Sequence, residues 1–241
     1  MLFYKVIFTS INTFEMKKKL IVLTGAGISA ESGISTFRDA NGLWENHDIM
    51  EVASIEGYQR NPKLVQEFYN QRRKQLFDVE PNTAHHFLKE LENDFEVVII
   101  TQNVDDLHER AGSSKIIHLH GELRKARSEK DENQIIDWNK DIKLGDLAED
   151  GNQLRPHIVW FGEMVPEIEN AINEVLKADI LVIIGTSMQV YPAASLKDYA
   201  KTNVPIIYID PSDTYTNSSI THIKKKATES IEELKTILNN F

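Results

Sequence analysis

A glycine-rich turn behind a buried strand restricts the folds that this chain can adopt. The apolar run at residues 20–23 predicts the strand, and Gly25, Gly27 and Ala30 follow it in the pattern G-x-G-x-x-G/A. Such a turn can present bare backbone N–H groups at the start of a helix, where a diphosphate binds. The acidic residue expected about 20 positions later, at the end of a second strand, has no clear counterpart. Glu45 has the spacing but lies in a predicted loop, so an ordinary dehydrogenase is disfavoured.

A second loop follows the glycine turn along the chain. It carries Phe37, Arg38 and Trp44 and is long enough to fold over a bound ligand. We therefore expect the turn and this loop to form one ligand site.

The composition indicates a globular protein with one main core. The chain has 241 residues, of which 41% are apolar and 27% are charged. Its net charge of −10 argues against nucleic acid as a partner. The absence of cysteine excludes disulfides, thiolate catalysis and cysteine-based zinc sites. No stretch approaches the roughly 20 apolar residues of a membrane span, and residues 1–15 lack signal-peptide features, so we expect a cytoplasmic protein.

Five apolar strands alternate with helices along the sequence. The strands are predicted at residues 20–23, 96–101, 115–121, 178–184 and 204–209. This alternation predicts an α/β fold with a doubly wound, parallel, Rossmann-like sheet. The polar, irregular segment at 122–153 predicts a small inserted lobe.

The predicted organisation is an N-terminal extension followed by one catalytic domain. The extension spans residues 1–15, to which we assign no role, and the domain spans 16–241. Within the domain, the Rossmann-like core covers about 16–44, 80–121 and 155–241. The small lobe covers about 45–79 and 122–154.

Polar side chains follow the predicted strands where each strand ends. Gln102, Asn103 and Asp105 come directly after the strand at 96–101, and His120 lies at the end of the next. The carboxyl ends of parallel strands face the ligand crevice, so these side chains should meet there. Two alternatives stay open at this point: Asp105 or Asp106 can cap the following helix, and His120 can be either a satisfied edge residue or a general base.

The helix predicted from Asn61 to about residue 77 carries an arginine within its apolar stripe. Leu64, Val65, Phe68 and Leu76 form the stripe, Arg72 lies in its middle, and Tyr69 lies one turn earlier; Arg73 and Lys74 point elsewhere. Arg72 either snorkels out of the core or binds a carboxylate together with Tyr69. On the next predicted helix, capped by Asn82, His85 and His86 are expected on the surface.

Taken together, these motifs resemble those of the sirtuins, which are NAD-dependent protein-lysine deacylases. The resemblance runs from about Lys19 to the C-terminus. It rests on five ordered motifs: residues 25–29 (GAGIS) with Phe37 and Arg38, 101–105 (TQNVD), 118–121 (HLHG), 159–163 (VWFGE), and 185–187 (GTS) with Val190 and Pro192.

The resemblance implies that NAD is a co-substrate and that it binds across the strand ends. The diphosphate would lie on the glycine turn, Ile28 and Phe37 would close the nicotinamide pocket, and the adenosine would lie near residues 185–187 and 210–212. The implied NAD-binding residues are Gly25, Ala26, Gly27, Ile28, Ser29, Ala30, Phe37, Arg38, Trp44, Gln102, Asn103, Asp105, Gly185, Thr186, Ser187, Asp210, Pro211, Ser212 and Ala227.

The same resemblance implies the reaction and its catalytic residues, which are His120, Asn103 and Asp105. The acyl-lysine amide oxygen attacks the ribose carbon as nicotinamide leaves. His120 then acts as general base on a ribose hydroxyl, so that the acyl group is transferred to ADP-ribose.

Acylated proteins or peptides are the implied partners, held as an added strand between residues 159–163 and 189–191. In the branch of the family that acts on acidic acyl groups, a tyrosine and an arginine at the spacing of Tyr69 and Arg72 bind the distal carboxylate. The resemblance therefore favours removal of succinyl or malonyl groups, with acetyl groups also accepted. The implied substrate-binding residues are Tyr69, Arg72, Val159, Phe161, Gly162, Glu163 and Val190.

The small lobe departs from the family pattern of four cysteines around a structural zinc. The nearest positions hold Ser128, Asp131, Leu147 and Asp150, which is not a zinc set, so we expect no zinc. We expect packing by Ile135, Ile136 and Trp138 to hold the lobe instead. A milder departure is Asp210, where asparagine is expected.

Two other functions are compatible with a domain of this kind. A sirtuin-like NAD glycohydrolase or ADP-ribosyltransferase would not need the carboxylate-binding pair Tyr69 and Arg72. A silent NAD-sensing module would not need His120, Asn103 and Asp105 together. We expect a monomer that does not bind membranes or nucleic acid.

Overall fold

The computed structural model describes residues 16–35, 43–44, 46–212 and 219–241. Phe37 and Arg38, which the sequence assigns to the NAD site, lie outside these described residues. No helix in the described ranges is both long enough and apolar enough to span a bilayer.

A six-stranded sheet forms the larger part of the molecule, with the strand order β11-β10-β9-β1-β4-β5 and every neighbouring pair parallel. This confirms the predicted doubly wound fold and its five strands. The sixth strand, β11, has only three residues with an exposed threonine at its start, which is too short and polar to stand out in the sequence. The strands are β1 (Lys19–Thr24), β4 (Glu96–Thr101), β5 (Ile116–His118), β9 (Ile180–Ile184), β10 (Ile206–Ile209) and β11 (Thr221–Ile223).

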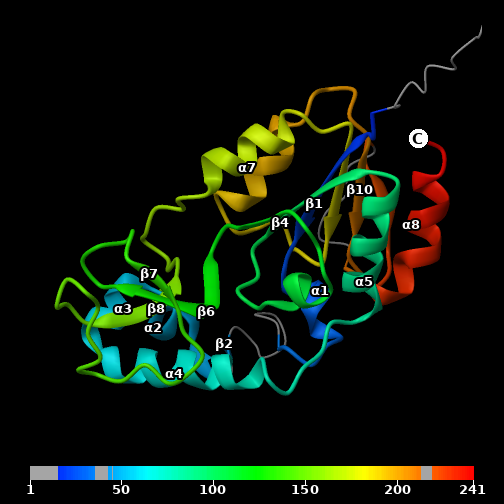
Figure 1. Cartoon of the computed structure of the whole chain (residues 1–241). Helices are drawn as coiled ribbons and strands as arrows, with labels where there is room; N and C mark the ends of the chain where they lie inside the picture. Colours follow the sequence, from blue (N-terminus) through cyan, green and yellow to red (C-terminus); the bar gives the residue numbers. More distant parts are fainter. Residues whose placement is uncertain (1–15, 36–42, 45, 213–218) are drawn as a thin grey trace, which may run out of the picture.

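Helices cover both faces of this sheet (Figure 1). Leu20 and Val22 of β1 pack into a core cluster with α5 (Thr83–Glu90) and α8 (Ile231–Leu238). Ile21 and Leu23 point to the opposite face and pack with α7 (Ile168–Val175) and η2 (Ala193–Tyr199). Because alternate side chains of β1 are buried on opposite faces, the strand is apolar throughout. Short helical segments complete this part: α1 (Ala26–Ala30), η1 (Leu91–Asn93), α6 (Leu107–Arg110) and η3 (Thr228–Ser230).

The small lobe combines helices with a three-stranded antiparallel sheet in the order β7-β6-β8. Its elements are the strand pair β2 (Leu43–Trp44) and β3 (His47–Asp48), the helices α2 (Ile49–Val52), α3 (Ile55–Arg60) and α4 (Pro62–Gln75), and the strands β6 (Gly121–Ser128), β7 (Ile135–Asp137) and β8 (Leu154–Ile158). The segment predicted as irregular therefore contains two strands. Since β8 pairs with β6, residues 154–158 lie with the lobe, whereas the sequence boundary placed residue 155 onward in the core.

Helix α4 begins as predicted, with the Asn61 side chain accepting a hydrogen bond from the Leu64 N–H at 3.2 Å. The prediction that Arg73 points away from the core is wrong. Arg73 is 2% exposed, and its Nε donates to the Leu123 carbonyl at 2.7 Å. Burial lowers the pKa of Arg73 to about 10. The error arises because α4 packs against β6 on a second side, which the apolar stripe alone does not indicate.

Hydrogen bonds connect the positions that the resemblance places nearest to zinc ligands. The Ser128 hydroxyl donates to the Asp150 carboxylate at 2.6 Å and accepts the N–H groups of Lys130 and Asp131 at 3.1 and 3.2 Å. Leu147 is 59% exposed. Across the described residues, no group of three or more acidic or histidine side chains could hold a metal ion.

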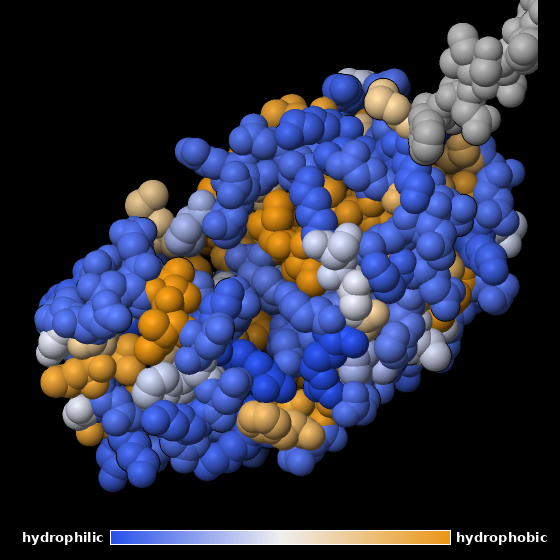
Figure 2. Space-filling view, in the orientation of Figure 1, coloured by the Kyte–Doolittle hydropathy of each residue, from blue (hydrophilic) through white to orange (hydrophobic). Residues whose placement is uncertain are grey.

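The small lobe's core differs from the predicted one. Ile135 and Ile136 are 43% and 39% exposed. Figure 2 shows an apolar area over the small lobe around β7, in addition to a larger one near the centre of the view. Because β7 is an edge strand of a small sheet, its side chains have little to pack against. The lobe instead has a larger core cluster that includes Phe68, Leu123 and Ile158. A smaller cluster contains Ala126, Ile142 and Leu154, with Trp138 packed against them as predicted.

Candidate active site at the strand ends

The strand register brings the predicted site segments to one edge of the sheet. Thr24 of β1 pairs with Thr101 of β4 and with Ile184 of β9, and Thr101 pairs with His118 of β5. Ile209 of β10 pairs with Ile184. The loops that follow these strands therefore start at the same level, as the sequence predicted.

Two glycine segments touch at the centre of this edge. The N–H groups of Gly25 and Gly27 donate to the carbonyls of Ile184 and Gly185 at 3.1 and 2.8 Å. A Cβ on Gly27 would lie 2.6 Å from the Gly185 Cα, and Gly185 has a φ of +63°. Glycine is therefore needed at both positions. The N–H groups of Gly25, Gly27 and Ile28 are bonded within the chain, so they are not among the bare N–H groups that the sequence predicts at this turn.

Ile28 is buried in the core, and its predicted place at the nicotinamide pocket stays a prediction. Its side chain is fully buried in the core cluster with Ala84 and Leu88 of α5, and Ala227, 5% exposed, lies in the same cluster. Ala26 and Ala30, on either side of Ile28 in α1, are partly exposed. The helix therefore directs Ile28 into the core.

Ser29, Asn103 and Asp105 form a buried polar cluster beside the turn. The Ser29 hydroxyl donates to Asp105 Oδ2 at 2.9 Å and accepts from Asn103 Nδ2 at 3.0 Å. Burial raises the pKa of Asp105 to about 6, although bonds from the Leu107 N–H and Ser29 oppose this shift. One carboxylate oxygen of Asp105 accepts the Leu107 N–H at the start of α6 at 3.2 Å, as the capping alternative predicts. The other oxygen bonds to Ser29.

His120 lies beside Gln102 at the end of β5. Its Nδ1 is 3.2 Å from the Gln102 carbonyl, and a carbonyl only accepts, so Nδ1 carries the proton and Nε2 has a free lone pair. Burial lowers the pKa of His120, which keeps the imidazole neutral near pH 7. The Gln102 amide donates to the Thr186 hydroxyl at 3.0 Å and so joins this side of the site to β9.

The backbone around His120 is fixed by the small lobe. Its carbonyl accepts the Val159 N–H at 2.9 Å. Gly121 follows with a φ of +83°, and a Cβ there would lie 2.1 Å from the His157 carbonyl oxygen. The lobe's sheet therefore starts immediately after the histidine, and only glycine fits at this junction.

His118 is a site residue that the sequence motifs left without a role. Its Nε2 lies 2.6 Å from Glu109 Oε1 and its Nδ1 lies 3.2 Å from the Asn103 carbonyl. Burial acts to lower the pKa of His118, but Glu109 outweighs it and the pKa is raised. Both partners are acceptors, so the protonated imidazole satisfies both and braces Asn103. The alternation of His118 and His120 along the strand predicted at residues 115–121 was the available signal.

The prediction that His85 lies on the surface is wrong. His85 is 0% exposed and its ring centroid lies 4.9 Å from that of His108, whose Nε2 is 3.1 Å from the Thr24 hydroxyl. Asn82 and His85 form a capping box at the start of α5, which turns the histidine inward. The two rings thus lie behind the strand end of β1.

This buried pair should make the fold sensitive to acid. Burial lowers the pKa of His85 to about 4, whereas the unfolded chain titrates near its ordinary value of about 6.5. Below pH 6.5 the unfolded state therefore takes up the proton first, and stability falls as pH drops toward 4. For His85 alone the loss at pH 5 is about 2 kcal/mol relative to neutral pH. We expect His85→Gln, which retains a capping-box side chain, to lose less stability than the native protein between pH 7.5 and pH 5 in urea unfolding.

His86→Gln is the matched control, since His86 is exposed on the same helix. It should change the pH dependence of the urea midpoint much less than His85→Gln does, because burial lowers the pKa of His85 more than the neighbouring His86 does. An equal loss of stability on acidification in the native protein and in His85→Gln would contradict the assignment.

The predicted adenosine side is held by hydrogen bonds within the chain. Asp210 is 3% exposed, and its carboxylate accepts the Ser212 N–H at 2.9 Å as well as the Ser212 hydroxyl. The Tyr208 hydroxyl donates to the Thr186 carbonyl at 3.0 Å. Pro211 is exposed and Ser187 partly exposed at the same edge. An aspartate in place of the expected asparagine therefore organises its own loop.

The predicted carboxylate-binding pair lies on α4 in the small lobe. Tyr69 is 1% exposed, and its hydroxyl accepts the Trp160 indole N–H at 3.1 Å. Arg72 is partly buried one turn later, with its guanidinium carbon 5.6 Å from the centroid of the Phe68 ring. Trp44, predicted at the NAD site, packs its ring against Phe68 and Tyr69 at centroid distances of 4.8 and 6.2 Å.

The predicted peptide-binding segments separate into exposed and buried residues. Phe161 and Val190 are 42% and 37% exposed, Gly162 is also exposed, and Val159 is partly exposed. Glu163, by contrast, forms ion pairs with Arg155 at 2.6 Å and Arg127 at 3.2 Å. Its carboxylate therefore holds the loop together and does not face outward, and its role in substrate binding stays a prediction.

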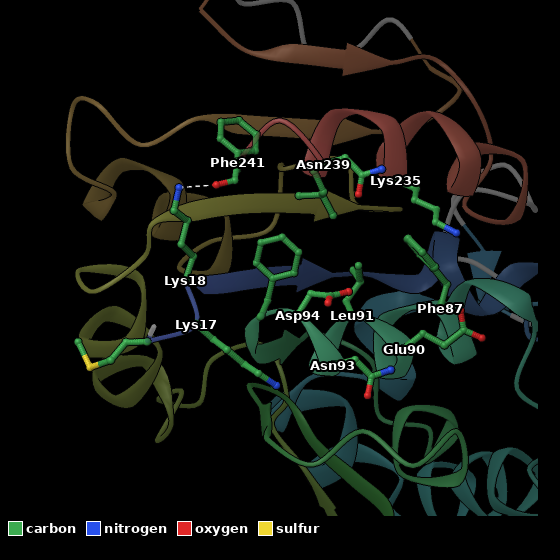
Figure 3. A pocket seen from close by; sticks show the side chains of 13 residues that line it. Lys17, Lys18, Phe87, Glu90, Leu91, Asn93, Asp94, Lys235, Asn239 and Phe241 are labelled. Carbon is green, nitrogen blue, oxygen red and sulfur yellow. Dashed lines mark hydrogen bonds between the residues drawn. The ribbon is translucent and has the colours of Figure 1, made fainter. Parts of the chain in front are cut away.

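A separate pocket of about 620 Å³ lies at the opposite end of the sheet (Figure 3). It is lined by Lys17 and Lys18 before β1, by Asp94 and Phe95 before β4, and by the end of α8. These are the amino ends of the strands, and none of the predicted site residues lines the pocket. The candidate site is therefore the edge at the carboxyl ends.

The fold is a doubly wound parallel sheet. Its carboxyl edge carries a glycine turn, a buried cluster of serine, asparagine and aspartate, and a neutral histidine. Together these features define a dinucleotide-binding protein. The model of the Sir2 family matches residues 25–192. The chain belongs to the Sir2 family, which confirms the predicted sirtuin resemblance.

Individual relatives agree with this assignment. The chain is 59% identical over 219 residues to an NAD-dependent protein deacylase of Helicobacter pylori, covering 90% of this chain and 96% of that protein. A Sir2 homologue solved in complex with NAD is 40% identical, with a TM-score of 0.82 and coverage of 93% and 90%. A Sir2 variant solved with deacetylated p53 peptide and 3′-O-acetyl ADP-ribose is 28% identical, with a TM-score of 0.77 and coverage of 92% and 94%.

Proposed function

We propose that this protein is an NAD-dependent protein-lysine deacylase that removes succinyl and malonyl groups, and also acetyl groups. The products would be nicotinamide, O-acyl-ADP-ribose and free lysine. Family membership and the names of the close relatives support the deacylase activity. The acidic acyl preference is supported by residues of this chain.

The carboxyl edge of the sheet fits NAD as the co-substrate. NAD would supply a ribose carbon that is activated when nicotinamide leaves. The close approach of Gly27 and Gly185 brings the glycine turn and the end of β9 together at the centre of this edge, where a dinucleotide would lie. Asn103 and Asp105 would border the nicotinamide ribose, with Ser29 fixing the direction of both side chains.

His120 is proposed as the general base. Its Nδ1–H is bonded to a carbonyl, so its Nε2 is the atom that can take a proton from a ribose hydroxyl. The lowered pKa of His120 keeps this lone pair available at neutral pH. Gln102 therefore sets the tautomer, and Gly121 and Val159 set the position of the ring.

The pairing of Tyr69 with Arg72 carries the proposed acyl preference. The two side chains lie one helical turn apart on α4, so they project from the same side of the helix. Burial raises the pKa of the Tyr69 hydroxyl far above its ordinary range, so the phenol remains a hydrogen-bond donor. A guanidinium and a phenol donor together match the distal carboxylate of a succinyl or malonyl group.

Mass spectrometry of one peptide in three acylated forms tests this proposal. Succinyl-lysine and butyryl-lysine have acyl chains of equal length, but only the first ends in a carboxylate, and acetyl-lysine is the short neutral reference. With NAD and the purified protein, we expect the succinyl group to be removed fastest, with succinyl-ADP-ribose as a product. Equal or faster removal of butyryl would contradict the acidic preference.

The same experiment distinguishes the alternative function. Consumption of NAD without change in any peptide would favour an NAD glycohydrolase or an ADP-ribosyltransferase. A reaction mixture without NAD is the control, since no peptide should lose its acyl group there.

A further inference from the structure

Trp160 connects the peptide-binding loop to the proposed carboxylate site. It lies directly after Val159, is 2% exposed, and donates its indole N–H to the Tyr69 hydroxyl at 3.1 Å. The two residues are 91 positions apart, on different elements of the small lobe. The contact therefore forms only in the folded chain, and it joins the Trp160 indole to the Tyr69 hydroxyl.

The indole is held in place on several sides. The Arg155 guanidinium carbon lies 3.4 Å from the indole centroid, and Glu163 fixes this guanidinium through bonds of 2.6 and 3.1 Å. Glu163 also accepts the backbone N–H of Trp160 at 2.8 Å. The Tyr58 ring packs against the indole with centroids 4.7 Å apart. The direction of the indole N–H is thus fixed before any substrate binds.

The chemistry of the two groups determines the direction of their hydrogen bond. An indole N–H can only donate, so the Tyr69 oxygen must be the acceptor. The phenol proton is then free to point to another acceptor. Among the described residues, the Tyr69 hydroxyl proton has no acceptor. Burial also keeps Tyr69 protonated, so a carboxylate near Arg72 would meet a donor that is already oriented.

We infer that Trp160 is a positioning residue for acidic acyl groups, because its indole N–H orients the Tyr69 hydroxyl toward the distal carboxylate. This inference rests on the proposed function. It assigns the preference for acidic acyl groups to Tyr69, Arg72 and Trp160, and Trp160 acts only through Tyr69.

Steady-state kinetics on succinyl-lysine and butyryl-lysine peptides test the inference in Trp160→Phe, Tyr69→Phe and the double variant. The quantity of interest is the ratio of kcat/KM for the two peptides. We expect Trp160→Phe to lower this ratio roughly tenfold, as loss of a hydrogen bond serving a charged group predicts. The double variant should resemble Tyr69→Phe alone, since Trp160 has no effect on the ratio without the phenol.

The control is Tyr58→Phe, which removes a hydroxyl beside the same indole and should leave the ratio unchanged. An equal loss on both peptides in Trp160→Phe, or additive effects in the double variant, would overturn the inference. If Tyr69→Phe and Arg72→Met both leave the ratio unchanged, the proposed acidic preference itself fails. If they lower the ratio and Trp160→Phe does not, only the role of Trp160 fails.

Indole NMR signals provide a test that does not require a Trp160 variant to fold. The chain has three tryptophans, and labelling with ¹⁵N gives one indole signal for each. We expect Tyr69→Phe to move the Trp160 signal, and succinyl-lysine peptide to move it more than butyryl-lysine peptide does in the native protein. Equal shifts with the two peptides would overturn the inference.

Discussion

His120→Ala should abolish acyl transfer while leaving NAD binding largely intact. The imidazole holds its proton on Nδ1 against the Gln102 carbonyl, so Nε2 is the base that alanine removes. General base catalysis contributes about 10²- to 10⁴-fold, and we expect a loss within this range in the rate of O-acyl-ADP-ribose formation. Calorimetric titration with NAD should give an affinity close to that of the native protein.

The order of steps allows a sharper test of the same variant. In the proposed reaction nicotinamide leaves before the base acts, so exchange of labelled nicotinamide into NAD, with acylated peptide present, should persist in His120→Ala. His86→Ala is the control, because this histidine is exposed on α5, and it should retain full activity. Retention of more than about a tenth of native deacylation in His120→Ala would exclude His120 as the base.

Arg72→Met should reduce desuccinylation far more than deacetylation. Methionine retains most of the aliphatic length of arginine but cannot bind a carboxylate. When a site is built to bind a charged group, removal of its bonding partner strongly weakens the reaction of the charged substrate. We therefore expect kcat/KM for succinyl-lysine peptide to fall roughly 100-fold. The value for acetyl-lysine peptide should change by less than about threefold.

Arg60→Met is the matched control for this comparison. Arg60 is exposed in the last turn of α3, and its replacement should alter neither substrate. If Arg72→Met lowers both activities equally, the arginine has a structural role, as in the snorkelling alternative that the helix pattern also allows.

Local patterns in the sequence were sufficient for the fold and for part of the site. The apolar runs of β1, β4 and β9 are buried on both faces, so their continuous hydrophobicity identified them directly. Asn61 and Asn82 cap their helices as their positions before α4 and α5 indicate. The polar residues that follow the strands lie together because the carboxyl ends of parallel strands meet at one edge of the sheet.

The errors arose where a side chain depends on a partner far along the chain. Arg73 is buried because it bonds to the carbonyl of Leu123, 50 residues further along the chain. His85 is drawn inward by its cap and by contact with His108. A periodic pattern reports the face of an isolated element, and it carries no information on such long-range partners.

The hydroxyl–carboxylate bond between Ser128 and Asp150 has a consequence for the conditions in which this lobe can assemble. A lobe tied by thiolates requires a supply of metal and a reducing environment before it can close. Here both bonding groups are part of the newly made chain, and the sequence has no thiol that an oxidant could modify. Closure of this lobe should therefore depend neither on a thiolate-bound metal nor on the redox state of its surroundings.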